Sequence, residues 1–163
     1  MAALIRPRAE TDLPACVVAL RATHEVSRYP VRWPRDPVRW LTSSGRDVQA
    51  WVAAADGAVV GHVALGHDDD IAGTEKGPSL AIMRLFVAPT ARGRGVGAAL
   101  LDAAVDFVRA NASRPVLTVA DSGGAAIRLY ERLGWRRIGQ RRADWQEPDG
   151  RHPTVYDYVL DPP

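Results

Sequence analysis

The sequence predicts a single domain of the α/β (α+β) class, with a mixed, mostly antiparallel sheet of about seven strands flanked by helices. Its 163 residues suit one domain, and 47% of them are hydrophobic, which is enough for a full core. Strand-like and helix-like segments follow one another in the order β-α-(α)-β-β-β-α-β-α-β-β. Asp56-Gly57 between two strand-like runs is a strong hairpin signal, and the last two strands also read as antiparallel.

The first half of the chain is predicted to hold a strand, a helix, a long loop and a hairpin. Residues 3–8 read as a short strand, and residues 12–26 read as a helix because apolar residues recur there at helical spacing. Residues 28–40 hold three prolines, two tryptophans and a tyrosine, which predicts a loop with a short helix near Asp36-Pro37. The hairpin strands are expected at 48–55 and 58–66.

The second half is predicted from the same patterns. We expect loops at 67–78 and 143–153, strands at 80–87, 116–120, 135–142 and 154–160, and helices at 95–111 and 125–133. The run 80–87 is almost uninterrupted in its apolar character, so it is predicted to be a central strand buried on both faces. Gly134 is expected just after the end of the second helix. With no repeat and no linker in the chain, residues 1–163 are predicted to be one domain.

Composition excludes several classes of protein. Arginine makes up 20 of the 21 basic residues, but the net charge is only +2, so we predict no nucleic-acid partner. No apolar run is long enough for a membrane span or a signal peptide, which predicts a cytoplasmic protein without a membrane partner. Cys16 is the only cysteine, so no internal disulfide or cysteine-built metal site can form, and we predict no metal. We expect its thiol to be a small core residue.

The segment that follows strand 80–87 carries the strongest chemical signal. Gly93, Gly95 and Gly97 alternate with other residues where a helix is about to begin, so their backbone N–H groups are uncovered. Arg92 and Arg94 flank the same spot, and the positive end of the helix dipole points at it. The segment is therefore predicted to hold a phosphate or pyrophosphate.

Three interpretations of this segment are compatible with its spacing. Residues 93–98 match G-x-G-x-x-A, a variant of the dinucleotide-binding fingerprint. A doubly wound dinucleotide domain, however, needs more parallel βαβ units than the chain after Gly97 can supply. A glycine-rich helix entry without a ligand is the second interpretation, although clustered glycines destabilise a helix start. The third is a loop matched to a different pyrophosphate.

Two sequence blocks favour the third interpretation. Arg92-x-x-Gly95-x-Gly97 behind Leu-Phe-Val-x-Pro resembles the acyl-CoA loop of the GCN5-related N-acetyltransferases, the GNAT family. Residues 125–135, AAIRLYERLGW, are similar to the family's A-x-x-L-Y-x-x-x-G-F segment, with Trp135 in place of Phe. The resemblance covers roughly residues 3–160. It implies the GNAT fold, acetyl-CoA as cosubstrate and no metal.

The resemblance also implies roles for individual residues. The pantetheine arm would pair with the backbone of Leu85, Phe86 and Val87. The pyrophosphate would bind at Arg92, Gly93, Arg94, Gly95, Val96, Gly97 and Ala98. Tyr130 matches the family's general acid, whose hydroxyl protonates the leaving thiolate. The alternatives are solvated charge for the two arginines and a core position for Tyr130.

The sequence departs from the family pattern at two places. Many relatives carry a Glu in the strand matching residues 80–87 that activates the amine, whereas residues 80–84 contain no acid. Candidate bases elsewhere are His24, Glu25, His62, His67 and Glu75, and His62 reads more readily as a satisfied sheet residue. The second departure is Gly123, where relatives often have an Asn that contacts the cofactor.

The acceptor is less constrained than the donor. Loops 28–40, 67–78 and 143–153 are expected to surround it, and the aromatic residues of the first loop either cover an acceptor or pin that loop to the core. Asp68-Asp69-Asp70 reads either as an attractor for a polycation or as a solvated turn. We predict acetyl transfer to a small-molecule amine by direct attack in a ternary complex. The alternatives are a protein N-terminal or lysine acetyltransferase and a catalytically idle acyl-CoA-binding module; a homodimer is compatible with the sequence.

Overall fold

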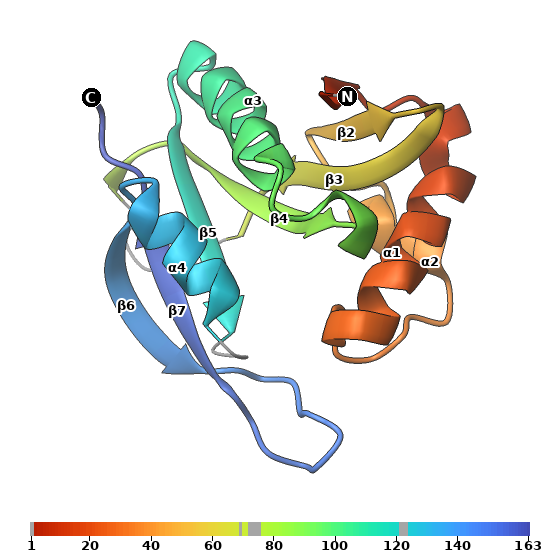
Figure 1. The fold of residues 1–163 in the computed structure, drawn as a ribbon. Helices are drawn as coiled ribbons and strands as arrows, with labels where there is room; N and C mark the ends of the chain where they lie inside the picture. Colours follow the sequence, from red (N-terminus) through yellow and green to blue (C-terminus); the bar gives the residue numbers. More distant parts are fainter. Residues whose placement is uncertain (1, 69, 72–75, 121–123) are drawn as a thin grey trace.

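The computed structural model describes residues 2–68, 70–71, 76–120 and 124–163 (Figure 1). The strands are β1 (Leu4–Pro7), β2 (Gln49–Ala55), β3 (Ala58–Gly66), β4 (Ser79–Val87), β5 (Arg114–Ala120), β6 (Arg136–Arg142) and β7 (Thr154–Val159). The α-helices are α1 (Leu13–Ser27), α2 (Pro37–Leu41), α3 (Val96–Ala110) and α4 (Ala125–Arg132). Short 3-10 turns lie at Glu10–Asp12, Ser43–Gly45 and Pro89–Ala91.

The seven strands form one sheet in the order β1-β2-β3-β4-β5-β7-β6. β4 and β5 are parallel, and every other neighbouring pair is antiparallel. This confirms the predicted mixed, mostly antiparallel sheet and the predicted order of elements. The position of β7 between β5 and β6 was not predicted, because hydrophobic patterning does not say which edge of a sheet a terminal hairpin joins.

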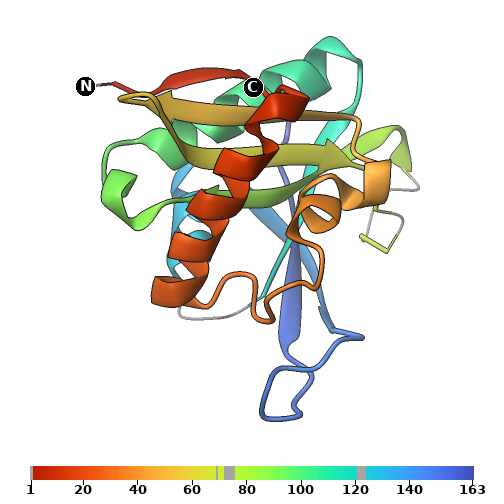
Figure 2. The ribbon, with the colours of Figure 1, turned by 90° about the vertical axis from the view of Figure 1, so that its right-hand side faces the viewer.

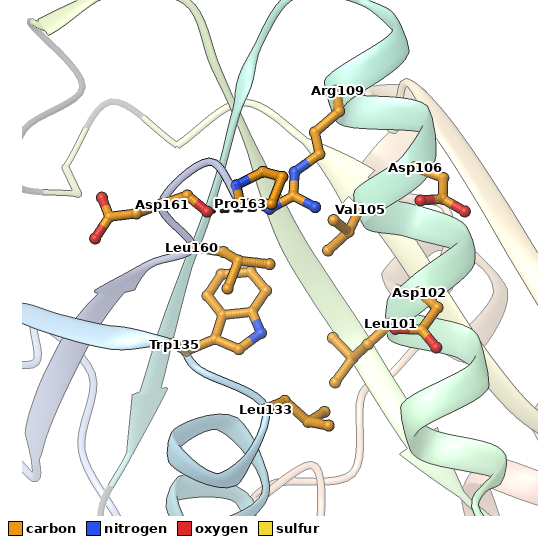
Figure 3. A pocket seen from close by; sticks show the side chains of 10 residues that line it. All are labelled: Leu101, Asp102, Val105, Asp106, Arg109, Leu133, Trp135, Leu160, Asp161 and Pro163. Atoms are coloured by element: carbon orange, nitrogen blue, oxygen red, sulfur yellow. Dashed lines mark hydrogen bonds between the residues drawn. The ribbon is translucent and has the colours of Figure 1, made fainter.

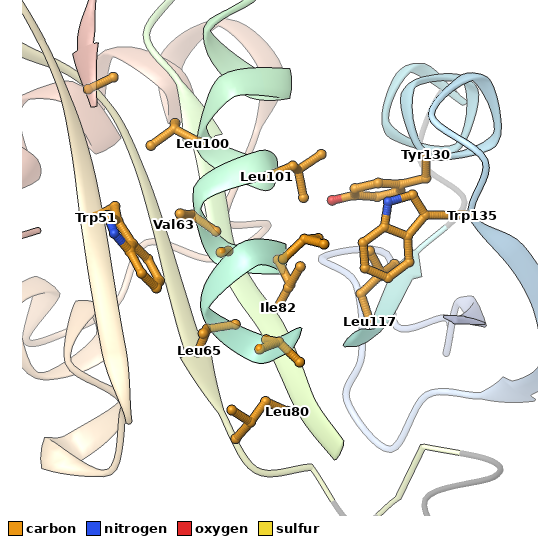
Figure 4. Packing of buried hydrophobic residues seen from close by; sticks show 14 of the residues in the cluster. Trp51, Val63, Leu65, Leu80, Ile82, Leu100, Leu101, Leu117, Tyr130 and Trp135 are labelled. Atoms are coloured by element: carbon orange, nitrogen blue, oxygen red, sulfur yellow. The ribbon is translucent and has the colours of Figure 1, made fainter. Parts of the chain in front are cut away.

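Helices cover both faces of the sheet. Figure 1 shows α3 and α4 in front of the sheet, and Figure 2 shows α1 and α2 on the opposite face. The larger core cluster lies under α3 and α4 and includes Trp51, Leu100, Tyr130 and Trp135 (Figure 4). A second cluster packs α1 and Leu41 against the other face.

Local chemistry explains the main turns and helix ends. Asp56 and Gly57 have φ of 51° and 77°, the pair of positive angles that a two-residue hairpin turn requires. Gly134 comes directly after Leu133, the C-cap of α4, and its φ of 87° is expected for a residue just past a helix C-terminus. Gly61 lets α3 approach β3, because a Cβ there would lie 3.0 Å from a Leu100 methyl carbon.

β4 differs from the prediction that it is buried along its whole length. Its first half, Leu80 to Ile82, is buried, whereas Met83, Arg84 and Leu85 are only half-buried. The strand is therefore central at one end and accessible at the other, and this difference defines the candidate site. No helix in the described part of the chain is long and apolar enough to cross a membrane.

Candidate active site

The parallel strands β4 and β5 separate halfway along their length. Their pairing runs from Ser79 and Arg114 to Ile82 and Leu117 and ends there. β4 continues to Val87 with β3 on its other side, so its remaining backbone has no strand partner on the β5 side among the described residues. Unpaired backbone groups of this kind can hydrogen-bond an extended ligand as they would an added strand.

A β-bulge lies at the start of this unpaired stretch. Met83 pairs with Ala64 and Phe86 pairs with His62, so two residues of β4 oppose one residue of β3. Arg84, one of these two, has a φ of 54°, which lies in the left-handed region. The bulge shifts the alternation of side chains along the strand. Met83 and Arg84 both contact the α2 region, and Leu85 and Val87 face the core under α3.

His62 on β3 fixes the bulge. Its ring is fully buried and stacks on Phe86 with ring centroids 5.4 Å apart. Nε2 lies 2.8 Å from Nη1 of Arg8, which can only donate, so Nδ1 carries the proton and donates to the Arg84 carbonyl at 2.9 Å. Burial lowers the pKa of His62 to about 4. The structure therefore supports the interpretation of His62 as a satisfied sheet residue and leaves it no free lone pair to act as a base.

The glycine-rich loop presents open backbone N–H groups. Gly93 and Gly95 have φ of 72° and 76°, a conformation that favours glycine. Gly95 is the N-cap of α3, and neither a capping side chain nor an acidic residue satisfies the first turn of the helix. No heavy atom lies within 4 Å of the place where a Cβ of Gly95 would be. Among the described residues, the first turn of α3 therefore has unpaired N–H groups with free space beside Gly95, an arrangement that can bind an anion.

Gly97 marks the point where three segments meet. A Cβ on this residue would lie 3.7 Å from a methyl carbon of Val87 on β4 and 3.6 Å from one of Leu129 on α4. Leu129 precedes Tyr130 in α4. The loop, the open end of β4 and the helix that carries Tyr130 are therefore in contact.

The two loop arginines differ. Nε of Arg92 donates to the Val87 carbonyl at 3.2 Å, and Nη2 donates to Oγ of Ser27 at 3.0 Å. Arg92 thus joins the loop to β4 and to the end of α1. Arg94 is exposed and makes no hydrogen bond or ion pair with any described residue. Of the two side chains expected near phosphates, only Arg94 is free in this structure.

Tyr130 is a core residue whose hydroxyl has no partner among the described residues. Its side chain is 7% exposed and packs edge-on against Trp135 with ring centroids 6.0 Å apart. Figure 4 shows the ring extending from α4, with its hydroxyl oxygen directed toward α3. No described residue accepts a hydrogen bond from that hydroxyl or donates one to it. Burial raises the pKa of Tyr130, and nearby Tyr29 raises it further, so the phenol stays protonated at neutral pH.

A family model described as "Acetyltransferase (GNAT) family" matches residues 17–135. The chain belongs to the GNAT acetyltransferase family. The resemblance stated from the two sequence blocks is thereby confirmed.

Individual relatives agree with this family membership. The chain is 34% identical over 105 residues to an uncharacterised N-acetyltransferase of Methanocaldococcus jannaschii. That match covers 64% of this chain and 46% of the relative, so the chain spans about half the length of that curated relative.

Solved structures of the family share the fold. The ribosomal-protein-S18-alanine N-acetyltransferase from Escherichia coli has a TM-score of 0.74 and 23% identity, with 97% of this chain and 92% of that chain covered. Arabidopsis thaliana NAA60 in complex with acetyl-CoA has a TM-score of 0.73 and 22% identity, with 97% of each chain covered. At these identities the comparison establishes the GNAT fold.

The remaining candidate bases lie in different surroundings. Nδ1 of His24 donates to the Pro30 carbonyl at 2.7 Å, which leaves Nε2 as a free acceptor. Glu25 and His67 are exposed. Glu75 and Gly123 lie outside the described residues.

Two of the three loops expected around the acceptor are close to each other. Nη2 of Arg32 donates to the Glu147 carbonyl at 3.4 Å, which links loop 28–40 to the β6–β7 loop. The aromatic residues of the first loop, Tyr29, Trp33 and Trp40, pack partly buried against the second core cluster. Asp68 accepts a hydrogen bond from the Asp70 backbone, as in a solvated turn, and Asp69 lies outside the described residues.

Sequence reasoning missed two charged residues on the strands of the sheet. Arg84 lies over the Trp40 ring, 4.2 Å from its centroid. Asp157 on β7 is buried and accepts from Thr118 at 2.6 Å and from Arg141 at 3.4 Å. Arg84 stands out in the sequence as the single charge in an apolar strand, and that signal could have found it.

A separate pocket of about 440 Å³ lies between the outer side of α3 and the C-terminal residues (Figure 3). Arg109 spans it and donates to the Asp161 carbonyl at 3.0 Å. None of the predicted site residues lines this pocket. Among the described residues no cluster of His, Cys, Asp or Glu could hold a metal ion.

Proposed function

We propose that this chain is an acetyl-CoA-dependent N-acetyltransferase that acetylates the primary amine of a small molecule. The observation that carries the proposal is the meeting of three features around Gly97. These are the unpaired end of β4, the uncapped start of α3 and the helix that presents the unpartnered Tyr130 hydroxyl. Together they offer an unpaired strand for an extended arm, backbone N–H groups for a pyrophosphate and a hydroxyl that can donate a proton.

The donor would bind along two segments. The pantetheine arm would hydrogen-bond the backbone of Leu85, Phe86 and Val87 where β5 has moved away. The pyrophosphate would accept from the N–H groups of residues 92–98, where the helix dipole favours negative charge. In this structure Nε of Arg92 donates to the Val87 carbonyl, which the pantetheine arm would need. Donor binding would therefore move the Arg92 guanidinium toward the phosphates.

The transfer would proceed by direct attack in a ternary complex. The neutral amine attacks the thioester carbonyl, and the tetrahedral intermediate collapses with cleavage of the C–S bond. The Tyr130 hydroxyl gives its proton to the departing thiolate, the attacking nitrogen loses a proton to solvent, and the Tyr130 phenolate takes a proton back from solvent. Cys16 is fully buried and burial raises its pKa to about 11, so it is unsuited to carry the acetyl group.

The activity is tested by measuring free thiol released from acetyl-CoA in the presence of amine panels. One panel contains small amines, and the other contains peptides with free N-termini or lysines. Release of one thiol per acetylated small amine supports the proposal. Turnover with the peptides alone would make the chain a protein acetyltransferase. Tight CoA binding without turnover would make it a binding module.

A further inference from the structure

Arg84 is a half-buried cation without a carboxylate partner among the described residues. Two other arginines that point into the protein have one: Arg8 pairs with Asp47 at 2.6 Å, and Arg141 pairs with Asp157 at 3.4 Å. Within the described part of the chain, the side chain of Arg84 makes one hydrogen bond, from Nε to the Trp40 carbonyl at 3.1 Å. Its Nη1 and Nη2 groups, four N–H donors, have no partner there. Burial lowers the pKa of Arg84, because the charged guanidinium is partly removed from water.

The backbone holds Arg84 in an unfavourable conformation. Its φ of 54° is in the left-handed region, which costs a non-glycine residue of order 1 kcal/mol. The hydrogen bond from His62 to the Arg84 carbonyl and the stacking of the guanidinium on Trp40 maintain it. Strain held in place by surrounding contacts is common at ligand-binding positions.

Arg84 is next to the segment proposed to hold the donor. It directly precedes Leu85, and the bulge turns its side chain to the α1–α2 face of the sheet. Tyr29 of loop 28–40 packs edge-on against the Trp40 ring that lies under Arg84, with ring centroids 6.0 Å apart. A molecule that contacted Arg84 would therefore lie beside Leu85, where the end of the pantetheine arm is proposed, and against loop 28–40.

We propose that Arg84 binds the carboxylate of the acceptor, and that the acceptor is a small amine with a carboxylate close to its amino group, as in a free amino acid. This inference rests on the proposed function and names the substrate class of the same site. The guanidinium fork matches a carboxylate with two parallel hydrogen bonds, and the Nε contact and the Trp40 ring set its plane. The carboxylate would fix the orientation of the acceptor and direct its amine past Leu85 toward the thioester.

The test compares matched acceptors that differ in one group. For each free amino acid, kcat/KM for acetylation is measured beside its carboxamide and its phosphonate analogue, and is expressed per concentration of neutral amine because the three groups give the amine different pKa values. Binding of each compound to the CoA-bound protein is measured by calorimetry. The wild-type protein is expected to prefer the carboxylate over the carboxamide by about 10- to 100-fold, the range for a hydrogen-bonded charge.

Two variants separate recognition from structure. Arg84→Gln keeps a polar side chain and is expected to bring the ratio of kcat/KM for carboxylate over carboxamide close to one, mainly through a higher KM for the carboxylate. Arg84→Lys keeps the positive charge and should restore part of that ratio. Arg21→Gln is the matched control, because Arg21 also lies over a tryptophan, 4.4 Å from the Trp33 centroid, but is exposed on α1. Arg21→Gln should leave the preference unchanged.

The outcomes distinguish this inference from the proposed function. Equal turnover of carboxylates and carboxamides, or an unchanged preference in Arg84→Gln, would overturn the carboxylate site while leaving the acetyltransferase in place. A preference for the phosphonate over the carboxylate would mean that Arg84 recognises a phosphate-like group. That result would also overturn the carboxylate site. If no amine is acetylated and no acceptor binds, both the carboxylate site and the proposed acetyltransferase function are overturned.

Discussion

At the residue scale, Tyr130 combines a buried ring with an accessible hydroxyl. It is a core residue by its packing, and its hydroxyl is nevertheless without a partner among the described residues. Among the described residues no fully buried side-chain oxygen or nitrogen lacks a hydrogen-bond partner, so the Tyr130 hydroxyl oxygen is accessible to solvent. An accessible hydroxyl of this kind can donate to a ligand atom. Both sequence interpretations of Tyr130, core residue and proton donor, thus agree with its position, and its catalytic role stays a prediction.

Tyr130→Phe tests that role. The variant keeps the edge-on contact with Trp135 and loses no hydrogen bond to a described residue, so stability should change by less than about 1 kcal/mol. We expect kcat to fall by about 10²-fold or more, with acetyl-CoA affinity nearly unchanged. Thiol release at saturating acetyl-CoA measures kcat, and calorimetry measures the affinity.

Tyr158→Phe is the control for this experiment. Tyr158 contacts Tyr130 in the same cluster, but its hydroxyl donates to Glu131 at 2.9 Å. Its loss should reduce stability slightly and leave kcat unchanged. A Tyr130→Phe enzyme with wild-type kcat would remove Tyr130 from the mechanism.

The residues of the site were not equally predictable. The glycines and Tyr130 belong to local motifs, so their positions follow from short stretches of sequence. The surroundings of Arg84 depend on a bulge in β4 and on Trp40, which is far away in the chain. A single sequence contains no local signal for a contact of that kind.

At the element scale, the start of α3 and the bulge in β4 form the two ends of the candidate site. The helix start was predicted from its alternating glycines, and the structure gives the reason for two of them in the positive φ of Gly93 and Gly95. The bulge has no comparable signal in the residues of β4, because it inserts one residue without a change in the apolar pattern that predicts the strand.

Gly95→Asp tests the helix start. Asp tolerates the left-handed conformation better than most residues, and its carboxylate would face the proposed pyrophosphate. Acetyl-CoA affinity, measured by calorimetry, should fall by about 10-fold or more relative to Gly95→Asn, which has the same shape without the charge. Equal affinities for the two variants would place the phosphates elsewhere.

The bulge predicts a specific dependence of stability on pH. His62 has an ordinary pKa of 6.5 in the unfolded chain and about 4 in the folded protein, so the unfolded chain binds the proton more readily. The stabilisation is complete above pH 6.5 and is lost as the pH falls from 6.5 through 4, by up to about 3 kcal/mol. Urea unfolding across this range measures it. His62→Gln should flatten the curve, and an unchanged slope would contradict the assignment.

At the scale of the whole molecule, the candidate site is assembled from one strand and two helices. β5 separates from β4 after Leu117, which among the described residues leaves the second half of β4 open on that side, next to α3 and α4. The sequence predicted the number, type and order of the elements. It did not predict their neighbours in the sheet, because strand order depends on long-range packing that periodicity does not record.

A ligand that joins these elements should stabilise the entire fold. At a concentration of 100 Kd, acetyl-CoA should add about 2.7 kcal/mol to the free energy of unfolding. For a chain of this size that corresponds to a rise of roughly 5–10 °C in Tm. NAD at the same concentration should have no effect in the same scan. Stabilisation by NAD and not by acetyl-CoA would favour the dinucleotide interpretation of residues 93–98.

One molecule of acetyl-CoA is proposed to span the glycine-rich loop, the open part of β4 and Tyr130. A crystal structure of the protein with CoA is the decisive measurement. We expect the pyrophosphate on the N–H groups of residues 92–98, the pantetheine paired with Leu85–Val87, and the sulfur within hydrogen-bond reach of the Tyr130 hydroxyl oxygen. CoA bound in the pocket between α3 and the C-terminal residues, or a sulfur beyond hydrogen-bond reach of Tyr130, would contradict this proposal.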